Sequence, residues 1–487
     1  MSGPEWARRA LAEVLDRVAV TAAEAGERFP LYADPDTGRW TTTGRGSWAG
    51  GFWAGLLWLR ARHTGDPADL AAASACTARL ARWADADTST RGLILWYATA
   101  PAAGDAGARE LRGRAAEACL AAFDAELGLV PWGSAFGGPR LLARVDGVPG
   151  MVPLLAEAGP AGPAAAASHL ERHLTLCLHP TPPEARPVSG IRLASEARLA
   201  SEARSASEAR PASDACLGSP EERPASEARP LLAAPAPIPA PVNAPGPAPA
   251  PAPPSAPDLV PASVPALAAA PVGSPSVPAP SPGPGPVHPP APGSARGPDP
   301  GRGGPGQEPG RGRAPGPGLV PAWSFEAGVG WRACEDPPAG WSRGRAWLLL
   351  ALADVLHRPA VAERLPDSPR EIAERLAEAW AGAGAELVPP ADEARPEGPL
   401  DTSAAAVTAV ALLKLARLPG PRSADHAYRA AEILKRLVEG HLSRGRLLDG
   451  CYDAGKGAAV RHELVWGDFF LALGLAELTA LIDIRDV

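Results

Sequence analysis

Tryptophan is the residue type in this sequence whose number and placement best suit the binding of a sugar. The chain has 14 Trp against 4 Tyr and 7 Phe. An indole ring offers a flat apolar face for stacking on a sugar ring, together with one N–H donor. Each Trp can instead fill the core, but several share a bias towards helix starts, and this bias favours sugar binding. Six stand at or near the starts of expected helices: Trp40, Trp48, Trp53, Trp341, Trp347 and Trp466.

Helices must position these tryptophans, because apolar residues recur at helical spacing through both ends of the chain. The first helix shows the pattern in Leu11, Val14, Leu15 and Val18. Twelve helices are predicted, over residues 6–25, 48–63, 67–84, 91–101, 107–125, 147–158, 163–178, 342–357, 367–384, 402–417, 423–440 and 464–482.

Capping residues support these helix starts. Asp66 before Pro67 is typical of an N-cap followed by the first helical residue. Ser368 is placed in the same way before Pro369. Thr402 or Ser403 is expected to cap the apolar run that follows it.

Strand signals are almost absent, so the helices must bury their apolar stripes on one another. Twelve helices in hairpins can do so by closing a double ring, with six nearly apolar helices inside and six amphipathic ones outside. Residues 48–59, 403–415 and 466–478 suit the inner ring, and residues 109–123 and 370–380 suit the outer ring. We therefore expect an all-α (α/α)6 toroid of the six-hairpin glycosidase type, in which the inner helix starts meet at the mouth of one funnel.

A long low-complexity segment divides the two helical parts. Residues 181–320 contain the unit SEAR four times, followed by Pro/Ala and Gly/Pro/Arg tracts. This segment has few aromatic or β-branched side chains to bury, so it is expected to be a disordered insert. Residues 1–180 and 321–487 are then the first and second parts of the toroid. A tolerated loop expansion is favoured over a partner-binding role, because long surface loops cost little.

Composition excludes several classes of function. The formal charge is 47 − 54 = −7 without a basic patch, which argues against nucleic acid. The six cysteines form no CxxC pair, so buried free thiols are expected in place of disulfides or a zinc site. No run of about 18 apolar residues suggests a membrane span. The amino terminus lacks the pattern of a secretory signal. We expect a cytoplasmic protein, and the Ala/Arg/Pro/Gly bias indicates a GC-rich bacterial genome.

Five stretches, in order, resemble motifs of the unsaturated glucuronyl hydrolases (glycoside hydrolase family 88, related to family 105). Residues 46–59 (GSWAGGFWAGLLWL) resemble the family's Trp-Thr-Gly-Gly-Phe-Trp helix start. Residues 146–155 (DGVPGMVPLL) are similar to its Asp-Thr-Met-Met-Asn-Leu-Pro-Leu-Leu segment, with one residue more. Residues 341–347 (WSRGRAW), 401–406 (DTSAAA) and 466–470 (WGDFF) resemble three further motifs.

The resemblance implies an unusual hydrolase. The family hydrates the C4=C5 bond of the unsaturated uronic acid that polysaccharide lyases leave on small oligosaccharides, and it needs neither metal nor cofactor. Asp146 matches the family's acid/base position. Such a carboxyl must be able to donate and then accept a proton. On local sequence alone, Asp146 is instead an N-cap of the helix that begins near Gly147.

The sequence departs from the family at several site positions. The family's second aspartate lies in a His-Asp-x-Gly-Phe stretch, and here Ser89 and Thr90 stand for its His and Asp, with Arg91 at the variable position. The glutamine after Arg-Gly is Arg345, and the histidine expected near the insert is absent. Arg91, if it faced Asp146, would favour the ionised carboxylate. Alternatively, Arg91, Arg343 and Arg345 can bind a carboxylate or sulfate of an altered substrate, or form structural ion pairs.

Three functions remain open at this point. The first is a glucuronyl-hydrolase-like glycosidase. The second is a carbohydrate-binding or regulatory protein on the same scaffold, without catalysis. The third is another toroid, such as a sugar epimerase or a terpene cyclase; no DxDD or DDxxD cluster is present, and His462 is the one well-placed histidine. The oligomeric state is left open.

Overall fold

The helices of the computed structural model begin and end close to the predicted positions. The structure describes residues 4–102, 104–178, 319–381 and 386–487. Over these residues the helix-rich fold is confirmed. The longer helices are α1 (Glu5–Ala25), α2 (Gly50–Thr64), α3 (Pro67–Arg79), α5 (Ala106–Ala121), α7 (Gly162–Leu178), α9 (Ser342–Leu356), α11 (Pro369–Ala381), α12 (Thr402–Ala416), α13 (Ser423–His441) and α14 (Val465–Leu478). The shorter ones include the π-helix η3 (Gly92–Trp96), which continues as α4 (Tyr97–Thr99), together with α6 (Met151–Ala156) and α10 (Pro359–Ala362).

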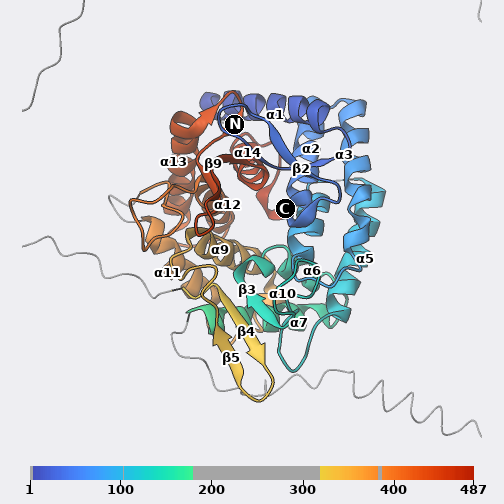
Figure 1. The fold of residues 1–487 in the computed structure, drawn as a ribbon, viewed down its shortest axis with the longest axis vertical. Coiled ribbons are helices and arrows are strands. Elements are labelled where there is room, and N and C mark those ends of the chain that lie inside the picture. The colour runs from blue at the N-terminus through green and yellow to red at the C-terminus, as the bar shows by residue number, and fades with distance from the viewer. Residues whose placement is uncertain (1–3, 103, 179–318, 382–385) are drawn as a thin grey trace, which may run out of the picture. The chain divides into compact units, whose positions relative to one another are not determined.

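Six elements contact their neighbours in a closed circle, in the order α2, η3, α6, α9, α12 and α14 (Figure 1). The helices α2, α9, α12 and α14 are buried on nearly every face, as their apolar sequences require. A second set packs outside them: α1 on α14 and α2, α3 on α2, α5 and α7 on α6, α11 on α9, and α13 on α12. The two stretches of described chain together build this one compact unit.

Aromatic side chains fill the middle of the circle. Phe52 of α2 packs on Tyr97 and Trp347 with ring centroids 5.2 and 6.4 Å away. Phe469 and Phe470 of α14 complete the cluster, 5.5 Å from Phe52. All five side chains are buried. The circle is therefore a packed core along part of its axis, and a ligand can enter it only from an end.

Three small sheets lie between the helices, where almost no strand was expected. Their strands are two to seven residues long, too short for a clear alternation of apolar and polar residues. One sheet has the order β2-β1-β9-β8, a second β3-β4-β5, and a third β6-β7. The strands are β1 (Phe29–Ala33), β2 (Trp40–Thr43), β3 (Leu142–Arg144), β4 (Ala322–Glu326), β5 (Gly330–Ala333), β6 (Leu442–Ser443), β7 (Arg446–Leu447), β8 (Gly450–Asp453) and β9 (Ala458–Leu464).

Two of the three predicted caps are confirmed and one is wrong, and the alternative role of Asp146 as a cap is not observed. Asp66 accepts a hydrogen bond from the backbone of the α3 start, and Ser368 Oγ accepts one from the start of α11. The cap of α12 is Asp401, whose carboxylate accepts from the Ser403 backbone N–H, so Thr402 and Ser403 lie inside the helix. Asp146 does not cap α6 either, because Gly150 precedes that helix with a left-handed φ of 71°.

Residues 179–318, which include nearly all of the predicted insert, lie outside the described residues. On either side of them, the Val320 backbone N–H donates to the Cys177 carbonyl at 3.0 Å. No described helix is long and apolar enough to cross a membrane. Four of the described cysteines are buried free thiols, and Cys334 is partly exposed. Burial raises the pKa of the Cys119 thiol to about 11.

Candidate active site

A cavity of 820 Å³ opens where the inner elements begin. Ser47 and Trp48 before α2, Thr90 and Leu93 at the start of η3, and Arg343 and Trp347 near the start of α9 form part of its wall. The loop before α9 and the β8–β9 hairpin also line it. The starts of α2, η3 and α9 therefore meet at one cavity. The residues that could carry chemistry or stack on a ring are Trp48, Thr90, Trp132, Arg144, Asp146, Asp336, Trp341, Arg343, Trp347, Tyr452, Asp453 and Lys456.

Asp146 lies on this cavity in a bidentate ion pair with Arg144. Strand β3 ends at Arg144, and Asp146 follows in the short 3-10 helix η4 (Val145–Gly147). Arg144 Nε and Nη2 donate to Asp146 Oδ1 and Oδ2 at 3.0 and 3.1 Å. The side chains of Arg144 and Asp146 are 23% and 18% exposed. Although burial opposes it, the Asp146 carboxylate raises the pKa of Arg144.

Strand pairing holds Arg144 in place across a long sequence distance. Arg144 pairs with Ala322 of β4, and Ala143 with Trp323. The guanidinium carbon of Arg144 lies 5.0 Å from the centre of the Trp132 ring, a cation–π contact. The β3–β4–β5 sheet lies in the lower part of the view in Figure 1. The strand that follows the undescribed segment thus positions a charged residue that precedes it.

Thr90, which stands where the resemblance expects the second aspartate, lies on the same cavity as Asp146. Close backbone packing brings the two segments together: a Cβ at Gly92 would overlap the backbone of Gly150 and Met151. The Thr90 hydroxyl lies 2.9 Å from the Thr88 hydroxyl. The structure therefore brings a hydroxyl to the cavity that Asp146 lines, at the position where the resemblance expects a carboxylate.

Two buried histidines of α7 lie behind Asp146. The Val130 N–H donates to His169 Nδ1 at 3.1 Å, which leaves Nε2 to donate to the Gly147 carbonyl at 3.3 Å. His173 Nδ1 donates to the His169 carbonyl at 2.7 Å. Burial lowers the pKa of His173 from 6.5 to about 4, and it lowers the pKa of His169 well below its usual range. Both rings are therefore neutral at pH 7.

Aromatic side chains also line this cavity. Trp48 stacks on Tyr452 with an interplanar angle of 13° and ring centroids 6.1 Å apart. Trp341 and Trp347 also line the cavity, the latter as the upper edge of the aromatic core. Trp466 is buried behind Trp48 at 4.7 Å, and its indole N–H goes to Ser403 Oγ. Three of the predicted tryptophans thus line the cavity, and Trp466 supports one of them.

Arg343 lines the cavity but uses its donors on the protein. Its Nη1 pairs with Asp401 and donates to the Cys451 carbonyl at 2.8 Å, and its Nη2 donates to the Tyr452 carbonyl at 3.0 Å. The guanidinium lies between the rings of Trp341 and Trp466, 5.1 and 5.5 Å from their centres. Arg343 therefore ties α9 to α12 and to the β8–β9 hairpin.

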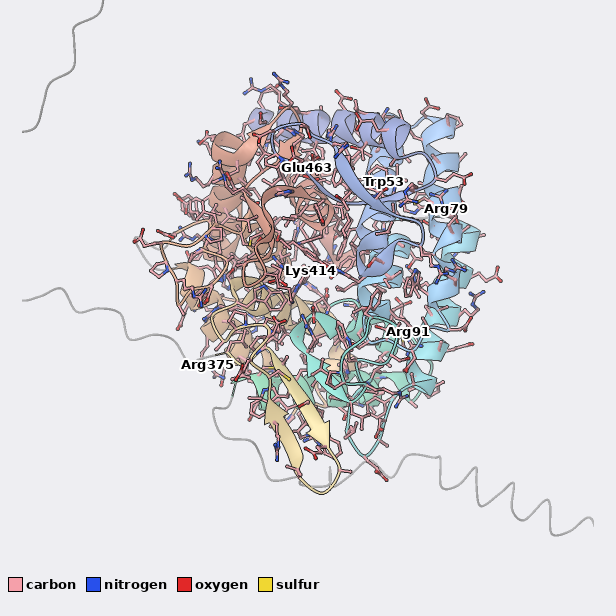
Figure 2. The ribbon with its side chains drawn as sticks, viewed as in Figure 1. Trp53, Arg79, Arg91, Arg375, Lys414 and Glu463 are labelled. Atoms are coloured by element: carbon pink, nitrogen blue, oxygen red, sulfur yellow. The ribbon has the colours of Figure 1, made fainter. Side chains whose placement is uncertain are left out.

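The structure does not bring Arg91 or Arg345 to the lining of this cavity. Arg91, labelled in Figure 2, is buried and donates to the carbonyls of Thr88, Ala84 and Ala118 at 2.9 to 3.2 Å. It satisfies the backbone around η3 and α5 and does not face Asp146. Arg345 forms a bidentate pair with Glu393 at 3.1 and 2.6 Å.

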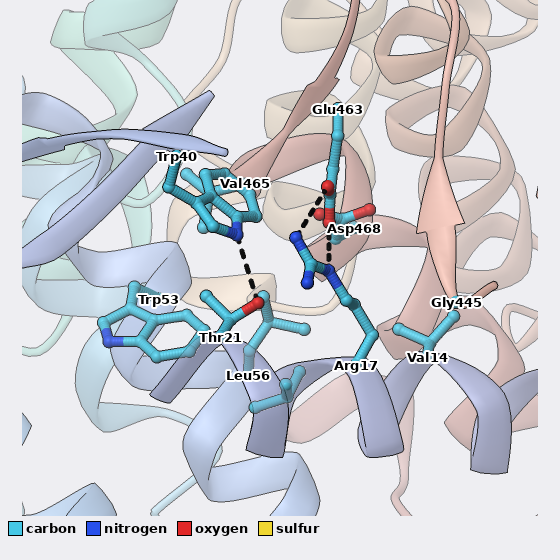
Figure 3. Close-up of a pocket in the computed structure, with 11 residues that line it drawn as sticks. Val14, Arg17, Thr21, Trp40, Trp53, Leu56, Gly445, Glu463, Val465 and Asp468 are labelled. Carbon is cyan, nitrogen blue, oxygen red and sulfur yellow. Dashed lines mark hydrogen bonds and ion pairs between the residues drawn. The ribbon is translucent and has the colours of Figure 1, made fainter. Parts of the chain in front are cut away.

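Trp53 is also placed elsewhere, beside a cavity of only 10 Å³ under α1 (Figure 3). There Arg17 pairs with Glu463 at 3.2 Å, and the Trp40 indole donates to Thr21 Oγ1 at 3.1 Å. Burial raises the pKa of Asp468 well above its usual range, with Glu463 adding to the effect. This small cavity is a packing feature of the ring, and Trp53 fills its wall.

Sequence reasoning missed Arg144, Trp132, Tyr452 and Lys456. Lys456 lies at the rim, with its ammonium 2.8 Å from Asp453 and 3.1 Å from the Asp336 carboxylate. Arg144 stands two positions before Asp146, and residues i and i+2 of an extended chain share a side. This signal is weak here, because β3 ends at Arg144 and Asp146 already lies in η4. The residues described contain no group of three or more His, Cys, Asp or Glu placed to hold a metal ion.

The comparisons with known proteins agree with this geometry at the level of the fold. No family model and no curated protein matches the sequence. Among solved structures, a UGL variant described with dGlcA-Glc-Rha-Glc has a TM-score of 0.61 at 17% identity over 97% of this chain and 96% of that one. An unsaturated glucuronyl hydrolase specific for heparin has a TM-score of 0.61 at 16% identity, over 99% and 100% of the two chains. The unsaturated glucuronyl hydrolase of Bacillus sp. GL1, described as responsible for glycosaminoglycan degradation, has a TM-score of 0.60 at 17% identity over 97% and 96%.

The fold of this chain is therefore a glycoside hydrolase fold. More particularly, it is the fold of the unsaturated glucuronyl hydrolases, at low sequence identity. The resemblance predicted from five short motifs is confirmed at this level.

Proposed function

We propose that this protein hydrates the C4=C5 bond of unsaturated uronyl oligosaccharides, with Asp146 as acid and base. The observation that supports it most is the place of Asp146: a carboxylate on an 820 Å³ cavity that Trp48 and Trp341 also line. The flat apolar face of an indole ring suits stacking on a sugar ring. We also infer that the circle of six inner elements, with its outer helices, is an (α/α)6 toroid with its funnel at this cavity.

The chemistry requires one group to act twice. The Asp146 carboxyl donates its proton to C4, and the resulting carboxylate takes a proton from a water whose oxygen bonds to C5. The sum is the addition of one water across the double bond, with the carboxyl regenerated. The hemiketal at C5 then opens and releases the leaving sugar. No other acid or base is needed, provided that the carboxyl is protonated at the start.

A second candidate is a carbohydrate-binding protein without turnover. Two observations favour it: Thr90 replaces the second carboxylate of the resemblance, and Arg144 engages both oxygens of Asp146 in the free protein. An opposite charge at this distance favours the ionised carboxylate, which cannot donate a proton. The two candidates share a site and differ in whether the acid forms.

Ultraviolet absorbance of the C4=C5 bond distinguishes them. A panel of unsaturated, lyase-derived disaccharides is incubated with the wild type, with Asp146→Asn, and with Asp16→Asn as a control for the same change on an exposed residue. Hydration predicts an absorbance decay that Asp146→Asn abolishes and Asp16→Asn leaves intact. A flat trace with folded wild type, together with measurable sugar binding, refutes hydration and supports the binding protein.

A further inference from the structure

The guanidinium of the Arg144–Asp146 pair has an edge that makes no hydrogen bond to the described residues. Arg144 gives Nε and Nη2 to Asp146, while its Nη1 has no hydrogen-bond partner among the residues that the structure describes. The side chain is 23% exposed and lines the cavity. The two N–H groups of Nη1, on a guanidinium whose carbon lies 5.0 Å from the centre of the Trp132 ring, are therefore open to a ligand.

The three arginines that the sequence suggested as anion-binding residues already form bonds to other groups of the protein. Arg91 donates to backbone carbonyls, and Arg345 pairs with Glu393. Both terminal nitrogens of Arg343 form hydrogen bonds, to Asp401 and to a backbone carbonyl. A buried guanidinium with its donors engaged gains little from a further anion, because it would have to give up existing bonds. Anion recognition by these three residues would therefore require the site to rearrange.

The remaining cations of the cavity lie at its rim. The side chains of Arg395 and Lys456 are 78% and 68% exposed, and each is paired with a neighbouring carboxylate. Exposed pairs of this kind are screened by solvent and contribute little. Arg144 is more enclosed, so a charge-assisted hydrogen bond to it is expected to be the stronger one.

We propose that Arg144 binds the carboxylate of an acidic sugar in this cavity and that, by doing so, it releases Asp146. This inference rests on the proposed function for its second half. A planar guanidinium with an open edge matches a carboxylate. When the ligand's carboxylate pairs with the Arg144 guanidinium, Asp146 loses its counter-charge and gains a negatively charged neighbour. A like charge favours the neutral form of a carboxyl group. The substrate's own carboxylate would then stand in for the second aspartate that Thr90 replaces.

Saturated monosaccharides test the first half without turnover. Binding of methyl glucuronide and of its neutral analogue methyl glucoside is measured by calorimetry at low salt for the wild type, Arg144→Gln, Arg144→Lys and Arg332→Gln. Arg332 is 64% exposed in the same small sheet and does not line the cavity, so it controls for the loss of one positive charge. The wild type and Arg332→Gln are expected to prefer the glucuronide by about 10- to 100-fold.

Arg144→Gln is expected to bind both sugars alike, with its affinity for the glucoside unchanged. Arg144→Lys, which keeps the charge but loses the fork, is expected to retain part of the preference; it also serves as the decisive variant if Arg144→Gln does not fold. An unchanged preference in both Arg144 variants overturns the proposal, and so does a wild type that binds neither sugar or shows no preference.

Kinetics separate this proposal from the proposed function. If unsaturated disaccharides are turned over, Arg144→Gln is expected to raise KM and lower kcat together, because recognition and release of Asp146 are both lost. Turnover with wild-type constants in Arg144→Gln overturns the inference and leaves hydration standing. A glucuronide preference that vanishes in Arg144→Gln, without any turnover by the wild type, supports Arg144 as the anion site and refutes hydration.

Discussion

Acidification is expected to destabilise this protein through His173, the buried histidine behind the candidate site. Its pKa is about 4 in the fold, against 6.5 for the free side chain, because burial penalises the charged ring. Between these two values the unfolded chain binds a proton that the folded chain does not. Stability is therefore full above about pH 6.5, falls as the pH falls through this window, and levels off near pH 4.

The fall in pKa from 6.5 to about 4 corresponds to about 3 kcal/mol in total, at about 1.36 kcal/mol for each pH unit. About 2 kcal/mol of this is lost between pH 7.5 and pH 5. The buried His169 acts in the same direction, since its pKa is lowered as well.

Urea unfolding followed by tryptophan fluorescence, at a series of pH values from 7.5 to 5, measures this loss. The comparison is with His173→Asn, whose amide can still donate to the His169 carbonyl but does not titrate. The variant is expected to be less stable at pH 7.5 and to lose about 2 kcal/mol less than the wild type on acidification. The same change at the exposed His63 should not alter the profile. A constant difference between wild type and His173→Asn at all pH values would refute the reasoning.

Three further predictions concern the ring and the site. Lys414 is buried with its ammonium 2.6 Å from Asp354; Lys414→Met should cost about 3–5 kcal/mol in chemical denaturation, and adding Asp354→Leu should recover most of it, because the uncompensated charge is removed. Gly92→Ala forces a Cβ onto the α6 backbone and should lower the stability by about 1–3 kcal/mol, whereas Gly113→Ala, with open space on α5, should raise it by about 0.5–1 kcal/mol; thermal unfolding compares them. Thr90→Asp places a carboxylate on the cavity that Asp146 lines and, on the proposed function, should raise the absorbance decay rate by roughly tenfold or more; no gain in a folded variant would count against the role assigned to this position.

The helices could be predicted because the inner ones are buried on all sides. Sequences such as that of α12 and α14 are almost uniformly apolar, and their small residues allow close packing. The boundary of α6 was missed because it depends on Gly150, whose left-handed φ turns the chain before the helix starts. That conformation is imposed by the contact with Gly92, which lies 58 residues away in the sequence and gives no local signal.

The candidate site could be predicted in part. Asp146 was predicted from its resemblance to a family motif, and the tryptophans from their bias towards helix starts. The structure brings Asp146, Trp48, Trp341 and Trp347 to one cavity. Arg144 was missed because its strand has three residues and pairs with β4, far along the chain. Arg91 was assigned to the site because nothing in its neighbourhood reveals the Ala118 carbonyl of α5 as its partner. Residue type identified the possible ligands, and the tertiary contacts decided which donors were free.

The hydrogen bond between the Val320 N–H and the Cys177 carbonyl shows that the chain on either side of residues 179–318 comes together in space. Residues 4–178 carry Asp146, Arg144 and Trp48. Residues 319–487 carry the strand that pairs with β3, and they also carry the cavity's rings Trp341, Trp347 and Tyr452. A chain cut within 179–318 would keep every described contact, yet neither piece alone would hold a complete site. Two separately produced pieces would then regain the site only on reassociation, so that ligand binding would report on complementation between the halves.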